Sequence, residues 1–256
     1  LKTTKKSYWK AWDNKIDLSK YSDERLADEL SDLLINAISL RSVNNDKSTG
    51  CFVSGGIDSS IVSSILKPDK LYTIHFDIGP DFDELNYAKL IAKHIKRDLH
   101  IVKAEPKNFT KTRKKIAYHL DTPCTWTSFS IWRLLEESSK EVKVILSGDG
   151  ADEIFAGYHR YLLLYHDQQI FNIPSLKNYN YLIKNYYGDA QERYTRLINR
   201  NTNKFDKKKN KELYDFVKFF FNKADNIVNA MTMTDFYSTM QVLLQMNDRL
   251  TSAFSM

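Results

Sequence analysis

The sequence predicts an α/β fold, in which a parallel sheet has helices on both faces, followed by a mostly helical part. Up to about residue 165, short apolar runs typical of buried strands alternate with segments whose apolar residues recur at helical spacing. Beyond that point Asn, Tyr, Lys, Leu and Phe dominate, and strand-like alternation is absent. We therefore expect an α/β core with an N-terminal helix over residues 1–165, and a helical portion of the same domain over residues 166–256.

The apolar periodicity also predicts the individual elements. Strands are predicted over residues 51–53, 71–77, 99–102 and 142–146. Helices are predicted over residues 23–41, 57–66, 81–95, 109–120, 128–139, 213–221 and 231–244. Ser22 is the expected N-cap of the first helix, and Asp81 and Glu84 form a capping-box pattern. Before the first helix, Trp9 and Trp12 stand among lysines, and we expect them to pack against the body of the protein.

Length and composition indicate a globular protein. Of the 256 residues, 42% are hydrophobic and 27% are charged. No apolar run approaches membrane-spanning length and no signal peptide is recognisable, so we expect a cytoplasmic protein without membrane contact. The two cysteines, Cys51 and Cys124, do not make a disulfide framework. The net charge of +6 results from 38 basic and 32 acidic residues that are scattered, and we therefore expect no nucleic-acid partner.

The sequence Val-Ser-Gly-Gly-Ile-Asp-Ser-Ser at residues 53–60 lies between a predicted strand and a predicted helix. Two glycines, Gly55 and Gly56, permit positive φ and leave room for a ligand against the backbone. The N–H groups and positive dipole end of the following helix, with the hydroxyls of Ser54 and Ser59, favour an anion. Asp58 adds a carboxylate, which suits a polyphosphate that carries a metal ion.

This loop is neither a Walker A motif nor Gly-x-Gly-x-x-Gly, because the lysine and the spacing are missing. It resembles the Ser-Gly-Gly-x-Asp-Ser loop of ATP pyrophosphatases. Those enzymes cut ATP between the α and β phosphates and hold the pyrophosphate that leaves. The alternative is an ordinary glycine turn before a helix, with the serines as local caps.

A second glycine turn follows the last predicted strand and is acidic. Asp149, Asp152 and Glu153 place three carboxylates within five residues, where they would repel one another without a counter-charge. A divalent metal or a substrate ammonium group would neutralise them. The alternative is a helix N-terminus that favours acidic residues.

The stretch Leu-Ser-Gly-Asp-Gly-Ala-Asp-Glu-Ile-Phe-Ala-Gly-Tyr-His-Arg-Tyr at residues 146–161 closely resembles the second signature of the asparagine synthetase family. Residues 121–123 and 247–256 also resemble that family. The resemblance extends from about Tyr8 to Met256, and it implies the Rossmann-like ATP-pyrophosphatase fold. β-Lactam synthetases and lasso-peptide cyclases share this scaffold.

The resemblance implies that ATP activates the side-chain carboxylate of aspartate as an acyl-adenylate, that pyrophosphate leaves, and that ammonia from glutamine attacks. By position, Asp58 and Asp152 would bind Mg²⁺, whereas Asp149 and Glu153 would face the substrate amino acid or the attacking amine. The catalytic candidates are therefore Asp149, Asp152 and Glu153. The nucleotide would be held by Val53, Ser54, Gly55, Gly56, Asp58, Ser59, Phe76, Ser147 and Gly148, with Val53 and Phe76 at the adenine.

The chain also departs from the family pattern. Glutamine-dependent members begin with a glutaminase domain that has a cysteine nucleophile, whereas this chain begins at Leu1. It stops at Met256, before the family's Glu-x-Arg-x-Pro-Phe segment and a catalytic lysine. We expect an internal fragment or a truncated relative that binds nucleotide better than it turns over, with a glutaminase domain in the intact protein.

Three other functions stay open. The first is a specialised relative that forms another amide, such as a β-lactam or lasso-type synthetase or a sugar-cluster amidotransferase. The second is a tRNA-modifying ATP pyrophosphatase such as a lysidine synthetase, although residues 147–161 do not fit it. The third is a nucleotide-binding remnant without activity. The remaining aromatic candidates, Trp126 and Trp132, are expected in the core.

Overall fold

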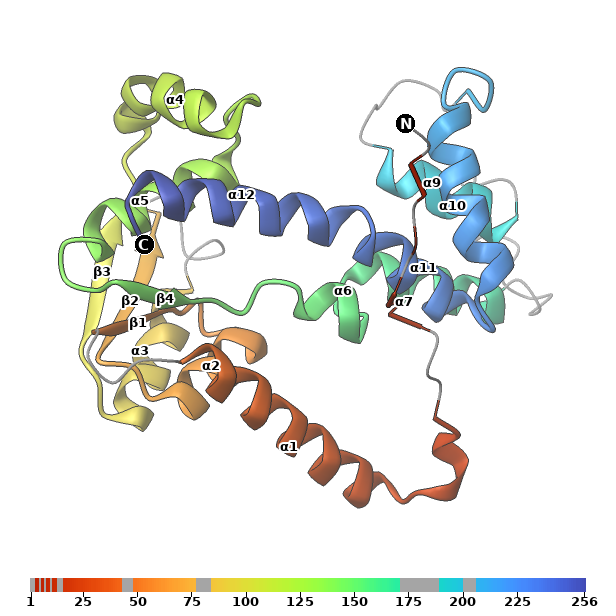
Figure 1. Cartoon of the computed structure of the whole chain (residues 1–256), viewed down its shortest axis with the longest axis horizontal. Helices are drawn as coiled ribbons and strands as arrows, with labels where there is room; N and C mark the ends of the chain where they lie inside the picture. Colours follow the sequence, from red (N-terminus) through yellow and green to blue (C-terminus); the bar gives the residue numbers. More distant parts are fainter. Residues whose placement is uncertain are drawn as a thin grey trace.

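The computed structural model describes residues 16–42, 48–76, 84–170, 189–199 and 206–256, and a few positions before residue 13. The four described strands lie on one side of the molecule and a group of helices on the other (Figure 1). The strands are β1 (Thr49–Phe52), β2 (Lys70–His75), β3 (Leu99–Lys103) and β4 (Val144–Leu146). The helices that surround them are α1 (Asp23–Arg41), α2 (Ile57–Leu66), α3 (Leu85–Ile95), α4 (Pro106–Leu120) and α5 (Trp126–Ser138).

The strands form one parallel sheet in the order β3-β2-β1-β4. Cys51 in β1 pairs with Leu71 in β2 and with Leu146 in β4, which fixes the register at the centre of the sheet. The predicted fold class is thereby confirmed. Because the strands are parallel, the turns after β1 and β4 leave the sheet at the same edge, where ligands of such sheets bind.

Alternate residues of the central strands face opposite sides of the sheet. Cys51 and Leu71 pack under α2 and α3, together with the buried Ala88. Phe52 and Tyr72 face the other side, where Leu134 of α5 covers them. Burial raises the pKa of the Cys51 thiol to about 12, which makes this cysteine a small core residue rather than a nucleophile.

The described helices after β4 contain another hydrophobic cluster. They are α6 (Ala151–Phe155), α7 (His159–Ile170), α9 (Ala190–Ile198), α10 (Lys211–Lys223), α11 (Ile227–Phe236) and α12 (Thr239–Ala253). Tyr161, Tyr194 and Met231 are buried where α7, α9 and α11 meet. Of the N-terminal aromatic residues, Trp12 packs on the end of α11, where its ring lies 4.9 Å from that of Phe236, whereas Trp9 is 63% exposed. No helix in the described ranges is both long enough and apolar enough to cross a bilayer.

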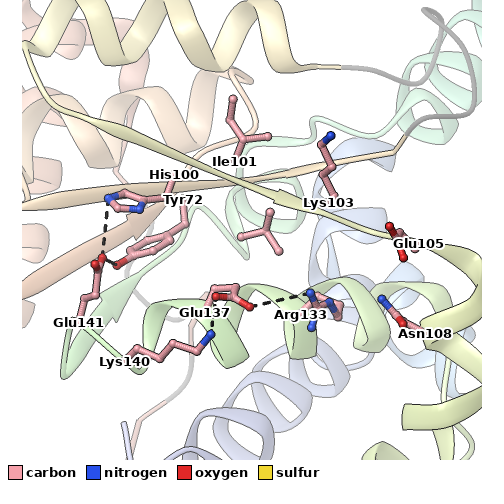
Figure 2. A pocket seen from close by; sticks show the side chains of 11 residues that line it. Tyr72, His100, Ile101, Lys103, Glu105, Asn108, Arg133, Glu137, Lys140 and Glu141 are labelled. Carbon is pink, nitrogen blue, oxygen red and sulfur yellow. Dashed lines mark hydrogen bonds and ion pairs between the residues drawn. The ribbon is translucent and has the colours of Figure 1, made fainter.

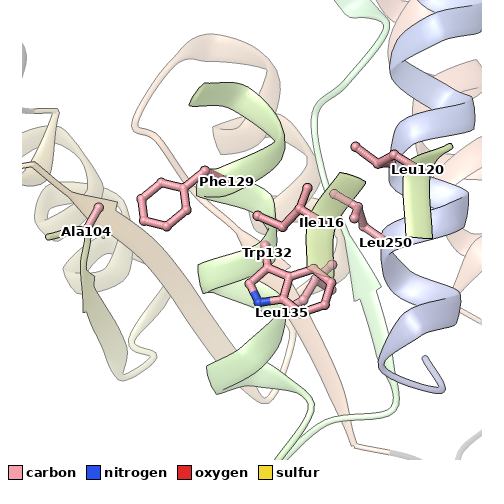
Figure 3. Packing of buried hydrophobic residues seen from close by; sticks show 7 residues of the cluster. All are labelled: Ala104, Ile116, Leu120, Phe129, Trp132, Leu135 and Leu250. Carbon is pink, nitrogen blue, oxygen red and sulfur yellow. The ribbon is translucent and has the colours of Figure 1, made fainter. Parts of the chain in front are cut away.

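Helix α12 connects this cluster to the sheet. In Figure 1 it runs from α11 across to α4 and α5. Near its end, Leu250 is fully buried against Ile116, Leu120 and Trp132 (Figure 3). Trp132 therefore lies in the core, as predicted.

Several elements differ from the sequence-based expectation. The helix predicted over residues 231–244 is two helices, because the chain turns at Tyr237 and Ser238. The helical spacing in α2 predicts one face that includes Ile57, Val62 and Leu66; Val62 and Leu66 pack against the sheet, whereas Ile57 is 78% exposed. Helix α1 has its predicted bounds but buries one apolar residue fully, Ile38. Asp81 lies outside the described residues, so its capping box is not described.

Replacement of Leu250 by Ala should destabilise the protein by about 2–5 kcal/mol, because it leaves a cavity between α12, α4 and α5. Chemical denaturation measures the free energy of unfolding. Val242→Ala is the matched control, since this residue of the same helix is 66% exposed and should change that free energy by less than about 0.5 kcal/mol. Equal effects of the two substitutions would contradict the packing of α12.

Candidate active site

The two glycine-bearing turns touch each other. A Cβ atom added to Gly148, in the turn after β4, would lie 2.7 Å from the backbone nitrogen of Ser59 and 2.9 Å from the carbonyl carbon of Asp58. These atoms belong to the first turn of α2, so only a residue without a side chain fits at position 148. Segments about ninety residues apart in the sequence therefore form one continuous surface.

A cavity of about 520 Å³ opens at this contact. Val53, Ser54, Gly56, Asp58 and Ser59 line it from the first turn, and Ser147, Gly148, Asp149, Asp152 and Glu153 line it from the second. Its apolar walls come from the sheet and from α5, and include Phe52, Ile74, Ile131 and Leu134. The arrangement places polar groups at the sheet edge beside an apolar surface, which is the combination typical of small-molecule sites.

The first turn is held by its own serines. The hydroxyl of Ser59 accepts a hydrogen bond from the backbone N–H of Ser54 at 3.2 Å, and the hydroxyl of Ser54 accepts one from the N–H of Gly56 at 3.2 Å. Gly56 is the N-cap of α2, and no side chain caps this helix. The N–H groups of its first turn are thus directed at the cavity edge, the usual arrangement for an anion.

The carboxylates of the second turn have separate surroundings. Asp149 accepts hydrogen bonds from the hydroxyl of Ser147 at 2.7 Å and from the side-chain amide of Asn247 at 2.8 Å. The carboxylate of Asp152 lies against Gly157, where an added Cβ would be 1.9 Å from it. Glu153 is fully buried, and one of its oxygens accepts a hydrogen bond from the hydroxyl of Tyr158 at 2.5 Å.

Burial, together with the hydrogen bond to Glu153, raises the pKa of Tyr158. The phenol therefore remains protonated at neutral pH and acts as a donor. Its partner Glu153 thus keeps one oxygen in a fixed hydrogen bond.

The cavity is strongly acidic. Its carboxylates are Glu84, Asp58, Asp149, Asp152 and Glu153, and its described lining contains no lysine, arginine or histidine. Burial raises the pKa of Asp58, and the charge of Asp152 raises it further. The two carboxylates are therefore close enough to repel each other, which is the situation that a divalent cation relieves.

Among the described residues, no group of three or more His, Cys, Asp or Glu side chains is placed to hold a metal ion. The pair Asp58 and Asp152 fits a different arrangement. Mg²⁺ commonly takes one or two protein carboxylates and completes its octahedron with phosphate oxygens and water. The donor set thus suits magnesium that enters with a nucleotide.

Two predicted nucleotide-binding residues are not among the lining residues. Gly55 has φ of 87°, and an added Cβ would meet the Cβ of Tyr87 at 2.3 Å, so this glycine shapes the turn against α3. Phe76 packs against the cluster around Phe129. Their proposed contacts with ATP remain predictions.

The lining includes residues that the sequence analysis did not place at the site. Trp126, expected in the core, is 55% exposed at the cavity and stacks on Phe109 with ring centroids 4.7 Å apart. Tyr158 and Leu243 also line the cavity. Trp126 follows Thr125, which caps α5 through reciprocal bonds with Ser128, and that capping box was the available signal for the start of this helix.

A second cavity, of about 530 Å³, lies between β3 and α5 (Figure 2). Several of its charged groups pair with one another. The carboxylate of Glu141 accepts a hydrogen bond from Tyr72 at 3.0 Å and lies 3.7 Å from His100, while that of Glu137 is 2.6 Å from the amine of Lys140. These pairings neutralise most of the carboxylates that line this cavity.

The Asp58→Asn variant should be more stable than the wild-type protein at pH 7 in the absence of metal and nucleotide. The pKa of Asp58 is raised in the folded protein, so the folded protein binds this proton more tightly than the unfolded chain does. The ionisation of Asp58 therefore lowers the free energy of unfolding as the pH rises from the usual aspartate range through the raised pKa. Denaturation midpoints measured from pH 4 to pH 8 should show the advantage of the variant shrinking towards the acidic end.

Asp69→Asn is the control of opposite sign. The hydrogen bond from the N–H of Thr49 lowers the pKa of Asp69, so its contribution is stabilising at pH 7 and is lost as the pH falls through that lowered pKa. This variant should be less stable than wild type at pH 7. If both variants shifted the midpoint in the same direction, the repulsion between Asp58 and Asp152 would be contradicted.

Comparison with known proteins agrees with the geometry. A family profile described as asparagine synthase matches residues 29–256. A putative asparagine synthetase [glutamine-hydrolyzing] 2 of Methanocaldococcus jannaschii is 31% identical over 172 residues, which are 65% of this chain and 33% of that protein. Asparagine synthetase [glutamine-hydrolyzing] 1 of Bacillus subtilis is 30% identical over 54% of this chain and 22% of its own length. Amidase chyE of Penicillium rubens is 26% identical over 60% of this chain and 26% of its own.

The matched region thus spans about a third or less of these relatives. The family profile, by contrast, covers most of the chain and includes both turns and α12. The chain belongs to the asparagine synthase family.

Proposed function

We propose that this chain carries the synthetase site of an ATP-dependent ligase that forms an amide through an acyl-adenylate. The observation that carries the proposal is the shared cavity, in which an anion-binding turn and an acidic turn meet at Gly148. The first turn suits a polyphosphate, and the second offers carboxylates to a cation or an amine. Family membership and the names of the similar proteins support amide formation.

In this mechanism the first turn of α2 and the serine hydroxyls bind the β and γ phosphates, and stabilise the charge that develops as pyrophosphate leaves. Asp58 and Asp152 are the proposed magnesium ligands, and Mg²⁺ would supply charge neutralisation on the triphosphate. The base lies against the apolar wall near Val53. Ser147 and Gly148 approach the nucleotide from the opposite side.

Asp149 and Glu153 are proposed to face the amino-acid substrate or the attacking amine. The substrates proposed first are aspartate, ATP and ammonia, with ammonia released from glutamine by a glutaminase domain of the intact protein. Attack of ammonia on the acyl-adenylate forms the amide and releases AMP. The amine loses one proton in this step, and an adjacent carboxylate is a suitable acceptor.

A second candidate is a specialised relative that forms another amide. Aspartate presents two carboxylates, and the described lining of the cavity offers no cationic side chain for the one that is not activated. The wall instead includes Trp126 and Leu243, which would suit a substrate with an apolar portion. A substrate without that second carboxylate would suit these residues better.

Substitution of Asp58 by Ala should weaken binding of Mg²⁺–ATP by at least about tenfold, which is about 1.4 kcal/mol. The reason is that this carboxylate is one of two proposed metal ligands. Titration calorimetry with ATP, with and without Mg²⁺, provides the measurement. Asp98→Ala, which removes an exposed carboxylate before β3 at the opposite end of the sheet, should leave the affinity unchanged. Unchanged affinity in the Asp58 variant would remove this residue from the site.

A pyrophosphate-release assay on the intact protein identifies the substrate. Each candidate amino acid is supplied with ATP, Mg²⁺ and either ammonia or glutamine. We expect release that depends on a carboxylate substrate and is abolished by Asp152→Asn. Aspartate as the preferred substrate supports the first candidate, and preference for an amino acid with an apolar side chain supports the second. Release that depends on added tRNA would contradict both.

A further inference from the structure

A buried polar cluster surrounds Asp235 of α11, which is fully buried. One of its carboxylate oxygens accepts hydrogen bonds from the guanidinium of Arg160, at 2.6 Å and 3.1 Å, and from the hydroxyls of Tyr161 and Tyr194. The other oxygen accepts one from the hydroxyl of Thr239 at 3.0 Å. Four helices therefore meet at a single carboxylate, which fixes the position of Arg160.

Arg160 also lies over the ring of Tyr158. Its guanidinium carbon is 3.9 Å from the centroid of that ring, within the range of a stacked cation–π contact. The side chain is 24% exposed, so the contact is largely shielded from water. A planar guanidinium anchored at two nitrogens restricts the plane of the ring beneath it.

Tyr158 in turn reaches the cavity. Its hydroxyl donates to one oxygen of Glu153, and the other oxygen of this fully buried carboxylate has no hydrogen-bond partner among the described residues. Glu153 lines the cavity at the acidic turn. A buried carboxylate oxygen without a donor is expensive unless a ligand supplies one.

We infer that Tyr158 and Arg160 are positioning residues for Glu153. Asp235 fixes Arg160, Arg160 fixes the ring of Tyr158, and the hydroxyl of Tyr158 holds one oxygen of Glu153 so that the other is presented to an N–H-bearing group of the substrate. This inference rests on the proposed function for the identity of the reaction. The coupling from Asp235 to Glu153 is a property of the fold and is testable without it.

The alternative is that the Asp235 cluster only joins the helices. The two roles differ in what Tyr194 and Arg160 do. Both donate to the same oxygen of Asp235, but Arg160 also stacks on Tyr158. Tyr194→Phe therefore perturbs the cluster alone, whereas Arg160→Lys keeps the positive charge beside Asp235 and removes the planar contact with the ring.

The first test is a crystal structure of each variant. In Arg160→Lys we expect the hydroxyl of Tyr158 to move beyond about 3.5 Å from Glu153, or to occupy two positions, because the ring is no longer held. In Tyr194→Phe the hydrogen bond between Tyr158 and Glu153 should be retained. If that hydrogen bond is intact in Arg160→Lys, the inference is wrong, whether or not the protein forms amides.

The second test separates binding of ATP from use of the other substrate. Tyr158→Phe keeps the ring and removes the hydroxyl, so kcat/KM for the substrate found in the pyrophosphate assay should fall by about 10–100-fold. The dissociation constant of Mg²⁺–ATP should change less than twofold. Arg160→Lys should also lower kcat/KM, by a smaller factor, and leave the dissociation constant of Mg²⁺–ATP unchanged. Tyr194→Phe should lower the melting temperature and leave both of these quantities unchanged.

A parallel loss of ATP affinity and substrate use in Tyr158→Phe would indicate a purely structural role and overturn the inference. If the wild-type protein releases no pyrophosphate with any amino acid, the proposed function fails. The crystallographic comparison then decides the coupling between Arg160 and Glu153 independently.

Discussion

The site depends on the close approach between the turn after β4 and the first turn of α2. At Gly148 the two backbones are so near that a methyl group would collide with the amide nitrogen of Ser59. The parallel sheet makes this approach possible, because β1 and β4 are neighbours and end at the same edge. The proposed contacts with nucleotide and substrate depend on this close approach, because neither turn encloses a cavity by itself.

The sequence predicted the sheet and its turns because these depend on local patterns. Short apolar runs, two of them followed by glycine turns, indicate parallel strands, and the bounds of α1 and α2 were correct because their apolar residues recur at helical spacing. The break between α11 and α12 was not predictable in this way. No glycine or proline marks it, and long-range contacts accompany it, including the stacking of Tyr237 on Phe220 at 5.2 Å.

The sequence predicted the parts of the candidate site that lie in two short motifs, because the residues of each motif indicate its chemistry. It did not predict residues that act through partners far away in the sequence. Trp126 was expected in the core, whereas in the structure it is 55% exposed at the cavity wall and stacks on Phe109. Asp235 has no motif around it. Its contact with Arg160 joins residues 75 positions apart, and a single sequence does not reveal such a pair.

Successive turns of α12 contribute residues to the wall of the cavity, to the contacts of the acidic turn and to the hydrophobic core. Leu243 lines the cavity, Asn247 donates to Asp149, and Leu250 is buried beneath α4 and α5. These positions are four and three residues apart and so share one side of the helix. One extra residue inserted before Leu243 would rotate that side by about 100° relative to α11. Substitutions along this helix would instead change the wall of the cavity while both glycine turns keep their sequence, so the two features can vary independently.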